Sequence, residues 1–220
     1  MTRLALVRHG ETIWHAENRY AGSTDIPLNP RGLEQAERLA IWAATADLAA
    51  IWVSPLRRAR ETAAPSERAT GIAARVDERL REIHFGEAEG LTNSEIMQSF
   101  PDAFAAFQSD PVAHHLPHGE DPRDVVRRAM ECFNEIQIAH PRGRVLVVTH
   151  NTVIRLALCQ LLGVPLSKYR SAFPVMANGA LSEIRLRDGE VSLLKLNSPL
   201  ESDVAALAEA DEADAPDSSP

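Results

Sequence analysis

The sequence of 220 residues has few of the features that mark membrane, secreted or disulfide-bonded proteins. Its two cysteines, Cys132 and Cys159, form no C-x-x-C pair, and a chain of this length buries enough core to fold without a disulfide. The most apolar long stretch, residues 145–166, is interrupted by His150 and Arg155, whereas a membrane span needs about 20 apolar residues. With no secretory signal at the start, we expect reduced thiols, a cytoplasmic location and no membrane partner.

Nucleotide-binding and metal-binding motifs are also missing. The sequence has no Walker A loop, no G-x-G-x-x-G, no H-E-x-x-H and no four-ligand Cys/His set. His114, His115 and His118 lie close together, but in a proline-containing stretch where solvated side chains are the more common arrangement. We therefore expect neither a metal nor another cofactor.

Basic residues are not in excess, and the net charge of −8 is unevenly distributed. Residues 201–220 hold seven acids and no Lys or Arg, so residues 1–200 are nearly neutral, with 24 acids against 23 bases. Nucleic acid would need a basic face, and we expect no such partner. The composition predicts one domain over residues 1–200 and an acidic, flexible tail over residues 201–220. An oligomer of this chain remains compatible with the sequence.

The hydrophobic pattern predicts an α/β fold. Short apolar runs with little alternation are typical of strands that are covered on both faces; they lie at 4–8, 49–53 and 144–148. Apolar residues at helical spacing occupy the segments between and after them, at 33–43, 57–69, 122–140 and 152–162. Such an alternation predicts a three-layer α/β/α sandwich around a mostly parallel sheet.

Two further segments modify this layered fold. Residues 179–197 alternate apolar and polar side chains around Asp188-Gly189, which predicts an antiparallel hairpin at the sheet edge and makes the sheet mixed. Residues 84–121 contain four histidines, three prolines and one predicted short helix, which is typical of an inserted lid over a site. In this lid insertion, Phe100, Phe104 and Phe107 share one helical face. That face either packs against the body or forms a wall for an uncharged or aromatic leaving group.

Polar side chains follow each predicted parallel strand. Arg8-His9 follows the first strand, Ser54 through Arg58 the second, and His150-Asn151 the third. Ligands of α/β sheets bind at the carboxyl ends of strands, so we expect these side chains to form one pocket. Two guanidiniums can clamp an oxyanion, and a neutral imidazole beside them can attack phosphorus. The sequence therefore predicts a pocket for a phosphate-like anion.

These motifs resemble those of the histidine phosphatase superfamily, in its phosphoglycerate mutase-like branch. The signature is LVRHGET, and the strings that follow in the family's order are YAGSTDIPLNPRGLEQA, SPLRRARETA, LREIHFGEAEGLT, PHGED and VLVVTHNTVIRL. The resemblance covers residues 3 to about 197. Its lid segment is most similar to small phosphomonoesterases, including those that act on α-ribazole phosphate or sugar phosphates. The domain over residues 1–200 would then be catalytic.

The resemblance implies a role for each of five residues. His9 would be the nucleophile that becomes phosphohistidine, while Arg8, Arg58 and His150 would hold the phosphoryl oxygens. Glu82 would protonate the leaving oxygen and then activate water. Chemistry alone leaves three other acids open as the proton donor, although each is more simply a surface or turn residue: Glu11, Glu87 and Glu89.

Two positions depart from the family pattern. Many relatives have Asn where this chain has His15, and Gly usually follows the second histidine where this chain has Asn151. His15 would replace one phosphate donor with an imidazole, and Asn151 would either narrow the pocket mouth or supply an extra amide donor. The predicted substrate-binding residues are Arg8, Arg58, His15, Gly22 and Asn151.

Three functions remain to be weighed. The first is a metal-independent phosphomonoesterase for small phosphate esters, the second a phosphoglycerate mutase-type phosphotransferase, and the third a non-catalytic protein that binds phosphorylated ligands. A mutase needs extra cations near the lid, but residues 83–122 hold seven acids and no Lys or Arg. Residues 82–85 also lack the Arg of the mutase-like pattern. The third function would predict loss of His9, His150 or Glu82, and all are present, so hydrolysis is favoured.

Overall fold

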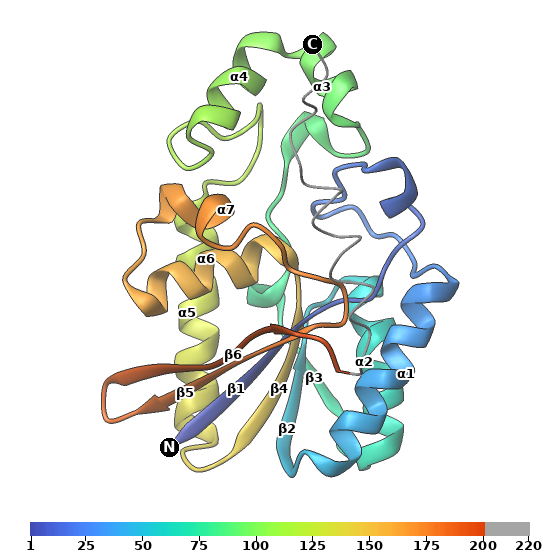
Figure 1. Cartoon of the computed structure of the whole chain (residues 1–220), viewed down its shortest axis with the longest axis vertical. Coiled ribbons are helices and arrows are strands. Elements are labelled where there is room, and N and C mark those ends of the chain that lie inside the picture. Colours follow the sequence, from blue (N-terminus) through green and yellow to red (C-terminus); the bar gives the residue numbers. More distant parts are fainter. Residues whose placement is uncertain (201–220) are drawn as a thin grey trace.

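A computed structural model describes residues 1–200 and contains a six-stranded sheet in the order β3-β2-β4-β1-β5-β6 (Figure 1). Strands β1, β2, β3 and β4 run parallel, whereas β5 and β6 are antiparallel to their neighbours. The predicted mixed, mostly parallel sheet is confirmed, and the predicted tail at 201–220 lies outside the described residues. The strands are β1 (Thr2–Arg8), β2 (Leu48–Val53), β3 (Ala74–Val76), β4 (Arg144–Thr149), β5 (Leu181–Arg187) and β6 (Glu190–Ser198).

Helices cover both faces of this sheet, which confirms the three-layer sandwich. Leu4 and Leu6 of β1 pack into one apolar cluster with two helices, α5 (Pro122–Ala139) and α6 (Asn151–Leu162). Ala5 and Val7, which alternate with them along the strand, face the opposite layer of α1 (Pro30–Thr45) and α2 (Arg57–Thr70). Both faces of β1 are therefore buried, which explains its uninterrupted apolar run.

Local signals set the ends of these helices. The Asn29 side chain accepts a hydrogen bond from Gly32 N–H at 2.8 Å and caps α1, with Pro30 in the first turn. Asp121 caps α5 in the same way. Gly163 takes a left-handed backbone conformation, with φ of +71°, where α6 ends.

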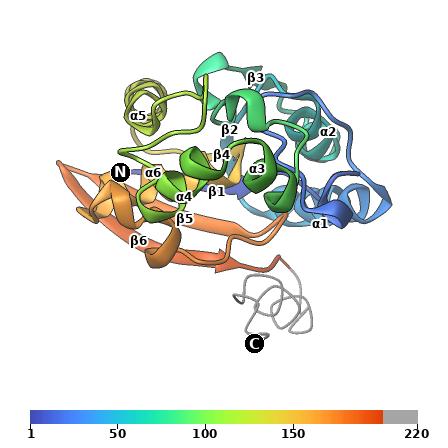
Figure 2. The ribbon, with the colours of Figure 1, turned by 90° about the horizontal axis from the view of Figure 1, so that it is seen from above.

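Residues 84–121 form a small apolar cluster of their own beyond the carboxyl ends of the strands, at the top of Figure 1 and over the sheet in Figure 2. The segment has two helices, α3 (Asn93–Ser99) and α4 (Pro101–Ser109), where the sequence predicted one. Phe104 and Phe107 are buried within this cluster, and Phe100 packs against it. These rings pack mainly within the insertion's own cluster, where the sequence analysis offered packing against the body, and none of the three lines the cavity at the carboxyl ends of the strands.

The shortest elements escaped the sequence analysis because a single turn or three paired residues leave no periodic signal. They are β3, α7 (Tyr169–Ala172) and the 3-10 turns η1 (His15–Glu17), η2 (Glu78–Leu80), η3 (Gly86–Ala88) and η4 (Leu166–Lys168). Within residues 1–200, none of the helices is both long enough and apolar enough to cross a membrane.

Candidate active site

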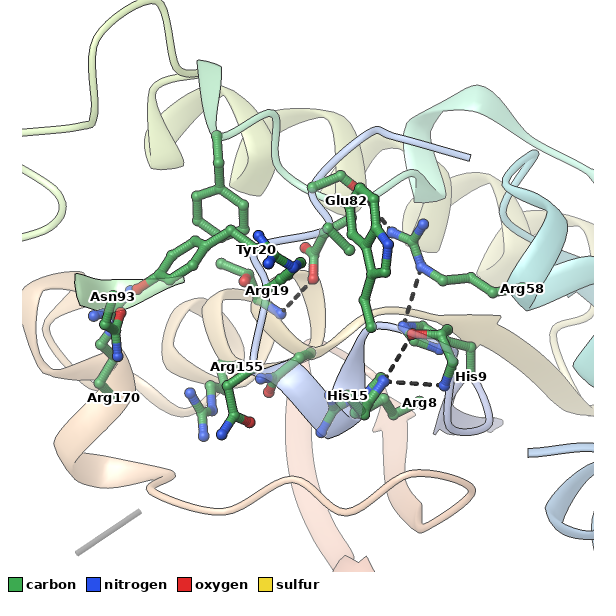
Figure 3. A pocket seen from close by; sticks show the side chains of 18 of the residues that line it. Arg8, His9, His15, Arg19, Tyr20, Arg58, Glu82, Asn93, Arg155 and Arg170 are labelled. Atoms are coloured by element: carbon green, nitrogen blue, oxygen red, sulfur yellow. Dashed lines mark hydrogen bonds between the residues drawn. The ribbon is translucent and has the colours of Figure 1, made fainter. Parts of the chain in front are cut away.

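The carboxyl ends of β1, β2 and β4 bring the predicted site residues to one cavity of about 390 Å³ (Figure 3). Backbone pairing fixes this convergence: His9 N–H donates to Thr149 O at 2.9 Å, and Ser54 N–H to Val148 O at 3.0 Å. The predicted residues that line the cavity are Arg8, His9, His15, Gly22, Arg58, Glu82 and Asn151. His150 is fully buried beside His9, with ring centroids 5.1 Å apart.

The hydrogen bonds of His9 place its ring proton on Nδ1 and leave Nε2 unprotonated. Nδ1 lies 2.7 Å from Gly10 O, which can only accept, so Nδ1 carries the ring proton. Nε2 then accepts a hydrogen bond from Arg58 Nε at 3.2 Å. Burial holds the pKa of His9 well below its ordinary value, and the charges of Arg58, His150 and Arg8 lower it further. His9 is therefore a neutral imidazole whose Nε2 lone pair is available at neutral pH.

Arg58 is held in place by the loop before α1. Its Nη1 and Nη2 donate to Thr24 O at 2.8 Å and to Gly22 O at 2.6 Å, and the side chain is buried. Burial lowers the pKa of Arg58, while Glu82 and Asp25 oppose that shift. The result is a fixed guanidinium directed at His9.

Glu89 organises this loop, a role that the sequence analysis missed when it treated the residue as a surface acid. Its carboxylate accepts the backbone N–H groups of Ser23 at 2.7 Å and Thr24 at 2.9 Å. Gly22 has a positive φ of +48°, and a Cβ there would meet Glu89 Oε1 at 2.0 Å. The turn therefore requires glycine at position 22 and an acceptor at position 89.

His150 shares a hydrogen bond with Ser54, whose Oγ lies 2.6 Å from Nε2. Nδ1 of His150 is buried and has no hydrogen-bond partner among the described residues. Burial, followed by the charge of Arg58, keeps the pKa of His150 well below its ordinary value. An unpartnered ring nitrogen this deeply buried is costly unless a ligand satisfies it.

Glu82 is the one carboxyl group among the described residues that line the cavity. Its oxygens accept hydrogen bonds from Ile83 N–H at 2.9 Å and from Thr152 N–H, near the start of α6, at 3.1 Å. Burial raises the pKa of Glu82, and these hydrogen bonds and Arg58 oppose the rise without cancelling it. The other acids left open by the sequence do not line the cavity: Glu11, Glu87 and Glu89.

Arg8 and His15 are joined by a hydrogen bond at the cavity. Arg8 Nη1 donates to Met176 O at 2.6 Å, and its Nη2 lies 3.0 Å from His15 Nε2. A guanidinium only donates, so His15 Nε2 accepts from Arg8, and Nδ1 lies 3.0 Å from Thr12 N and 2.8 Å from Thr12 Oγ1. Burial, then Arg8 and Arg58, lower the pKa of His15 to about 3. Arg8 and the neutral ring of His15 therefore lie in hydrogen-bond contact at the cavity and carry one positive charge between them.

Three further arginines line the cavity and were not among the predicted site residues: Arg19, Arg155 and Arg170. The expectation that extra cations are missing near the substrate is therefore wrong. It failed because it considered residues 83–122, whereas these cations come from the loop after β1, from α6 and from α7. Asn151 and Arg155 lie four residues apart on one helix, so helical spacing could have revealed Arg155.

The described residues contain no group of three or more His, Cys, Asp or Glu side chains placed to hold a metal ion. His114, His115 and His118 are exposed, which agrees with their interpretation as solvated side chains. Cys132 and Cys159 are buried and unpaired.

Comparison with known proteins agrees with this geometry. Residues 4–199 match the family model described as Histidine phosphatase superfamily (branch 1). Phosphoserine phosphatase 1 of Hydrogenobacter thermophilus is 33% identical over 197 residues, 90% of this chain and 92% of the relative. Glucosyl-3-phosphoglycerate phosphatase of Mycobacterium tuberculosis is 32% identical over 191 residues, 83% of this chain and 84% of the relative.

Comparison of the fold with solved structures supports the same family. The solved structure of Bacillus stearothermophilus YhfR has a TM-score of 0.86 and 36% identity, and the match covers 91% of this chain and all of that one. The expected activity class, a phosphatase of small phosphate monoesters, is confirmed by the family and by relatives that are named phosphatases. From its family model, its relatives and its fold, the chain belongs to branch 1 of the histidine phosphatase superfamily.

Proposed function

We propose that this phosphatase hydrolyses small phosphate monoesters in two steps, through a phosphohistidine on Nε2 of His9. The observation that carries the proposal is the fixed tautomer of His9, whose Nδ1–H is held by Gly10 O while Nε2 faces Arg58. A neutral imidazole with its lone pair directed at a guanidinium is a nucleophile placed beside a bound anion. The roles of the other site residues follow from where they lie around it.

The phosphoryl group is held by charges and N–H groups on several sides of His9. Arg8 and Arg58 supply guanidiniums, and His15 Nε2 accepts a hydrogen bond from Arg8 Nη2 that orients the Arg8 fork. Ser54 Oγ accepts Leu56 N–H at 3.3 Å and donates its own proton to His150 Nε2, so Nδ1–H of His150 is left for another oxygen. This cradle stabilises the charge that develops on the phosphoryl oxygens in the transition state.

In the first step, the Nε2 lone pair of His9 forms a bond to phosphorus as the P–O bond to the leaving group breaks. Glu82 gives its proton to the leaving oxygen, which departs as an alcohol. Burial raises the pKa of Glu82, which favours the protonated form that this task needs. The two backbone N–H groups at Ile83 and Thr152 hold the carboxyl in position.

In the second step, the Glu82 carboxylate takes a proton from water, whose oxygen bonds to phosphorus. The P–N bond breaks and its electron pair returns to Nε2 of His9. Inorganic phosphate leaves, and Glu82 is protonated again for the next turnover. Every proton and electron pair is accounted for by His9, Glu82 and water, so the scheme requires no metal.

Hydrolysis of p-nitrophenyl phosphate in the presence of EDTA tests this proposal. The wild-type protein should release p-nitrophenolate with unchanged activity under chelation, and His9→Ala should lose at least about 1,000-fold in kcat/KM. His114→Ala, which removes an exposed imidazole, is the matched control and should leave activity as it is. Activity retained in His9→Ala, or lost on chelation, would contradict the proposal.

A further inference from the structure

Asn151 carries a hydrogen-bond acceptor that no other described residue satisfies. Its side chain lines the cavity, yet Oδ1 is shielded from solvent and has no partner within residues 1–200. Burying an amide oxygen without a donor is unfavourable, so such an atom marks a place where a ligand supplies the donor. The scheme for hydrolysis gives this oxygen no task.

The start of α6 fixes where Asn151 stands. It is the first residue of that helix, between His150 and Thr152. The ring of His150 lies beside that of His9, with the centroids 5.1 Å apart. The N–H of Thr152 donates to Glu82 Oε2 at 3.1 Å. Asn151 is therefore flanked in the chain by the residue beside the nucleophile and by the residue that holds the proton carrier.

The donors around His9 are already matched to phosphoryl oxygens. Arg8 and Arg58 supply guanidinium N–H groups, and His150 supplies Nδ1–H. A phosphate dianion has only acceptor oxygens, so it cannot satisfy a further acceptor such as Asn151 Oδ1. The unsatisfied oxygen therefore needs a different partner, one that carries an O–H or N–H group.

The attacking water is a donor that every turnover brings to Glu82. It has two O–H groups, and the carboxylate of Glu82 takes the proton of one of them. The second O–H remains to be satisfied, and Asn151 Oδ1 is the acceptor next to the N–H group that holds Glu82. A leaving group such as p-nitrophenolate carries no donor, so the leaving group is not needed to fill this place.

We propose that Asn151 Oδ1 accepts the second O–H of the attacking water and thereby selects water over alcohols as the acceptor of the phosphoryl group. The inference rests on the proposed function, since the water attacks phosphorus on His9. One proton of the water passes to Glu82, the other stays on the oxygen that bonds to phosphorus, and the electron pair of the P–N bond returns to Nε2. An alcohol gives its only proton to Glu82 and sets an alkyl group against the amide oxygen, which leaves that oxygen unsatisfied.

The partition of the phosphoenzyme between water and methanol tests this selection directly. With p-nitrophenyl phosphate and an excess of methanol, ³¹P NMR measures the ratio of methyl phosphate to inorganic phosphate. Asn151→Ala should raise this ratio about tenfold, the worth of one hydrogen bond, and Asn151→Ser, which keeps a shorter acceptor, should raise it less. Asn134→Ala, which removes an exposed amide from α5, is the matched control and should leave the ratio unchanged. A merely structural role would not move a ratio that is set after the phosphoenzyme has formed.

The affected step separates this role from binding of the phosphoryl group. The burst of p-nitrophenolate reports the first step and should change less than about threefold in Asn151→Ala, whereas decay of the phosphoenzyme in water should slow about tenfold. A slower burst with an unchanged ratio would mean that the amide binds a phosphoryl oxygen through Nδ2, and it would overturn the proposal. An unchanged ratio with wild-type rates in both steps would overturn it as well.

Failure of the proposed function would give a different result. If neither the wild type nor Asn151→Ala carried acid-labile label after rapid quench, no phosphohistidine would exist to be partitioned, and the scheme on His9 itself would be wrong. Label on His9 in both proteins, with the same ratio of products, would retain that scheme and refute only the selection of water by Asn151.

Discussion

Arg58 Nε donates a hydrogen bond to Nε2 of His9 at 3.2 Å, so one guanidinium both orients the nucleophile and disfavours its protonation. The loop that holds Arg58 contributes the carbonyls of Gly22 and Thr24, and Glu89 fixes that loop. Glu89 therefore holds the loop, the loop holds Arg58, and Arg58 orients the Nε2 lone pair of His9. Each of these contacts can be tested separately.

Replacement of Arg58 by lysine should disable the site although the charge is kept. A lysine ammonium cannot reach Gly22, Thr24 and His9 together, because it lacks the fixed fork of the guanidinium. We expect kcat/KM for p-nitrophenyl phosphate to fall about 100-fold or more. The matched control is Arg57→Lys, an exposed neighbour that pairs with Glu61, and it should be near wild type. Less than a threefold loss in Arg58→Lys would contradict this role.

Glu82→Gln should slow hydrolysis in proportion to how poor the leaving group is. An alkyl phosphate needs its leaving oxygen protonated, so its kcat should fall about 100–10,000-fold. p-Nitrophenolate leaves without a proton, so its release in the first step should change less than tenfold, as measured by a stopped-flow burst. Glu78→Gln, an exposed acid on the 3-10 turn η2, serves as the control. Equal losses for both leaving groups would assign proton donation to another residue.

The pH dependence of kcat/KM should be bell-shaped, after correction for the second ionisation of the substrate. The acidic limb reports protonation of His9 and should lie well below pH 6.5, because burial lowers the pKa of His9. Glu82 is active when protonated, so activity should fall as pH rises through its raised pKa. The basic limb should disappear in Glu82→Gln. A basic limb that persists unchanged in this variant would refute the assignment.

Glu89→Gln tests whether the loop positions Arg58. A glutamine keeps one acceptor oxygen but places an NH₂ group against backbone donors at Ser23 and Thr24. We expect a stability loss of about 1–3 kcal/mol and a fall of about tenfold in kcat at saturating substrate. Thermal unfolding and steady-state kinetics measure the two effects. Glu87→Gln, which alters an acid paired with the exposed His118, is the control. Wild-type kinetics in Glu89→Gln would show that Glu89 does not position Arg58.

The central strands and the core of the site were predictable from the sequence because both leave local signals. β1, β4 and residues 51–53 of β2 are buried on both faces and therefore appear as apolar runs. His9 and His150 follow their strands directly, and Arg58 lies in the first turn of the helix that follows β2. The hairpin of β5 and β6 was marked by its Asp188-Gly189 turn. In each of these cases the residues that determine the structure are adjacent in the chain.

The parts that were not predictable depend on contacts distant in sequence. Glu89 looks like a turn acid until the fold brings it to Ser23 and Thr24, which lie more than 60 residues earlier. Arg170 sits on the four-residue helix α7, and its place at the cavity is set by Phe107, Tyr20 and Tyr169. A count of charges along residues 83–122 could not reveal cations that approach from other elements. The arrangement of these arginines around the cavity is set by the fold and not by their spacing in the sequence.

Rapid-quench trapping of the phosphoenzyme tests the central claim most directly. Enzyme mixed with ³²P-labelled substrate and quenched within milliseconds should carry label that is stable in base and released by acid, and peptide mapping should place it on His9. His9→Gln should carry none, and Glu82→Gln should accumulate it if hydrolysis of the phosphoenzyme is slowed more than its formation, as expected with p-nitrophenyl phosphate. Label on another residue, or full turnover in single-turnover experiments with no labelled enzyme at any time, would contradict the account.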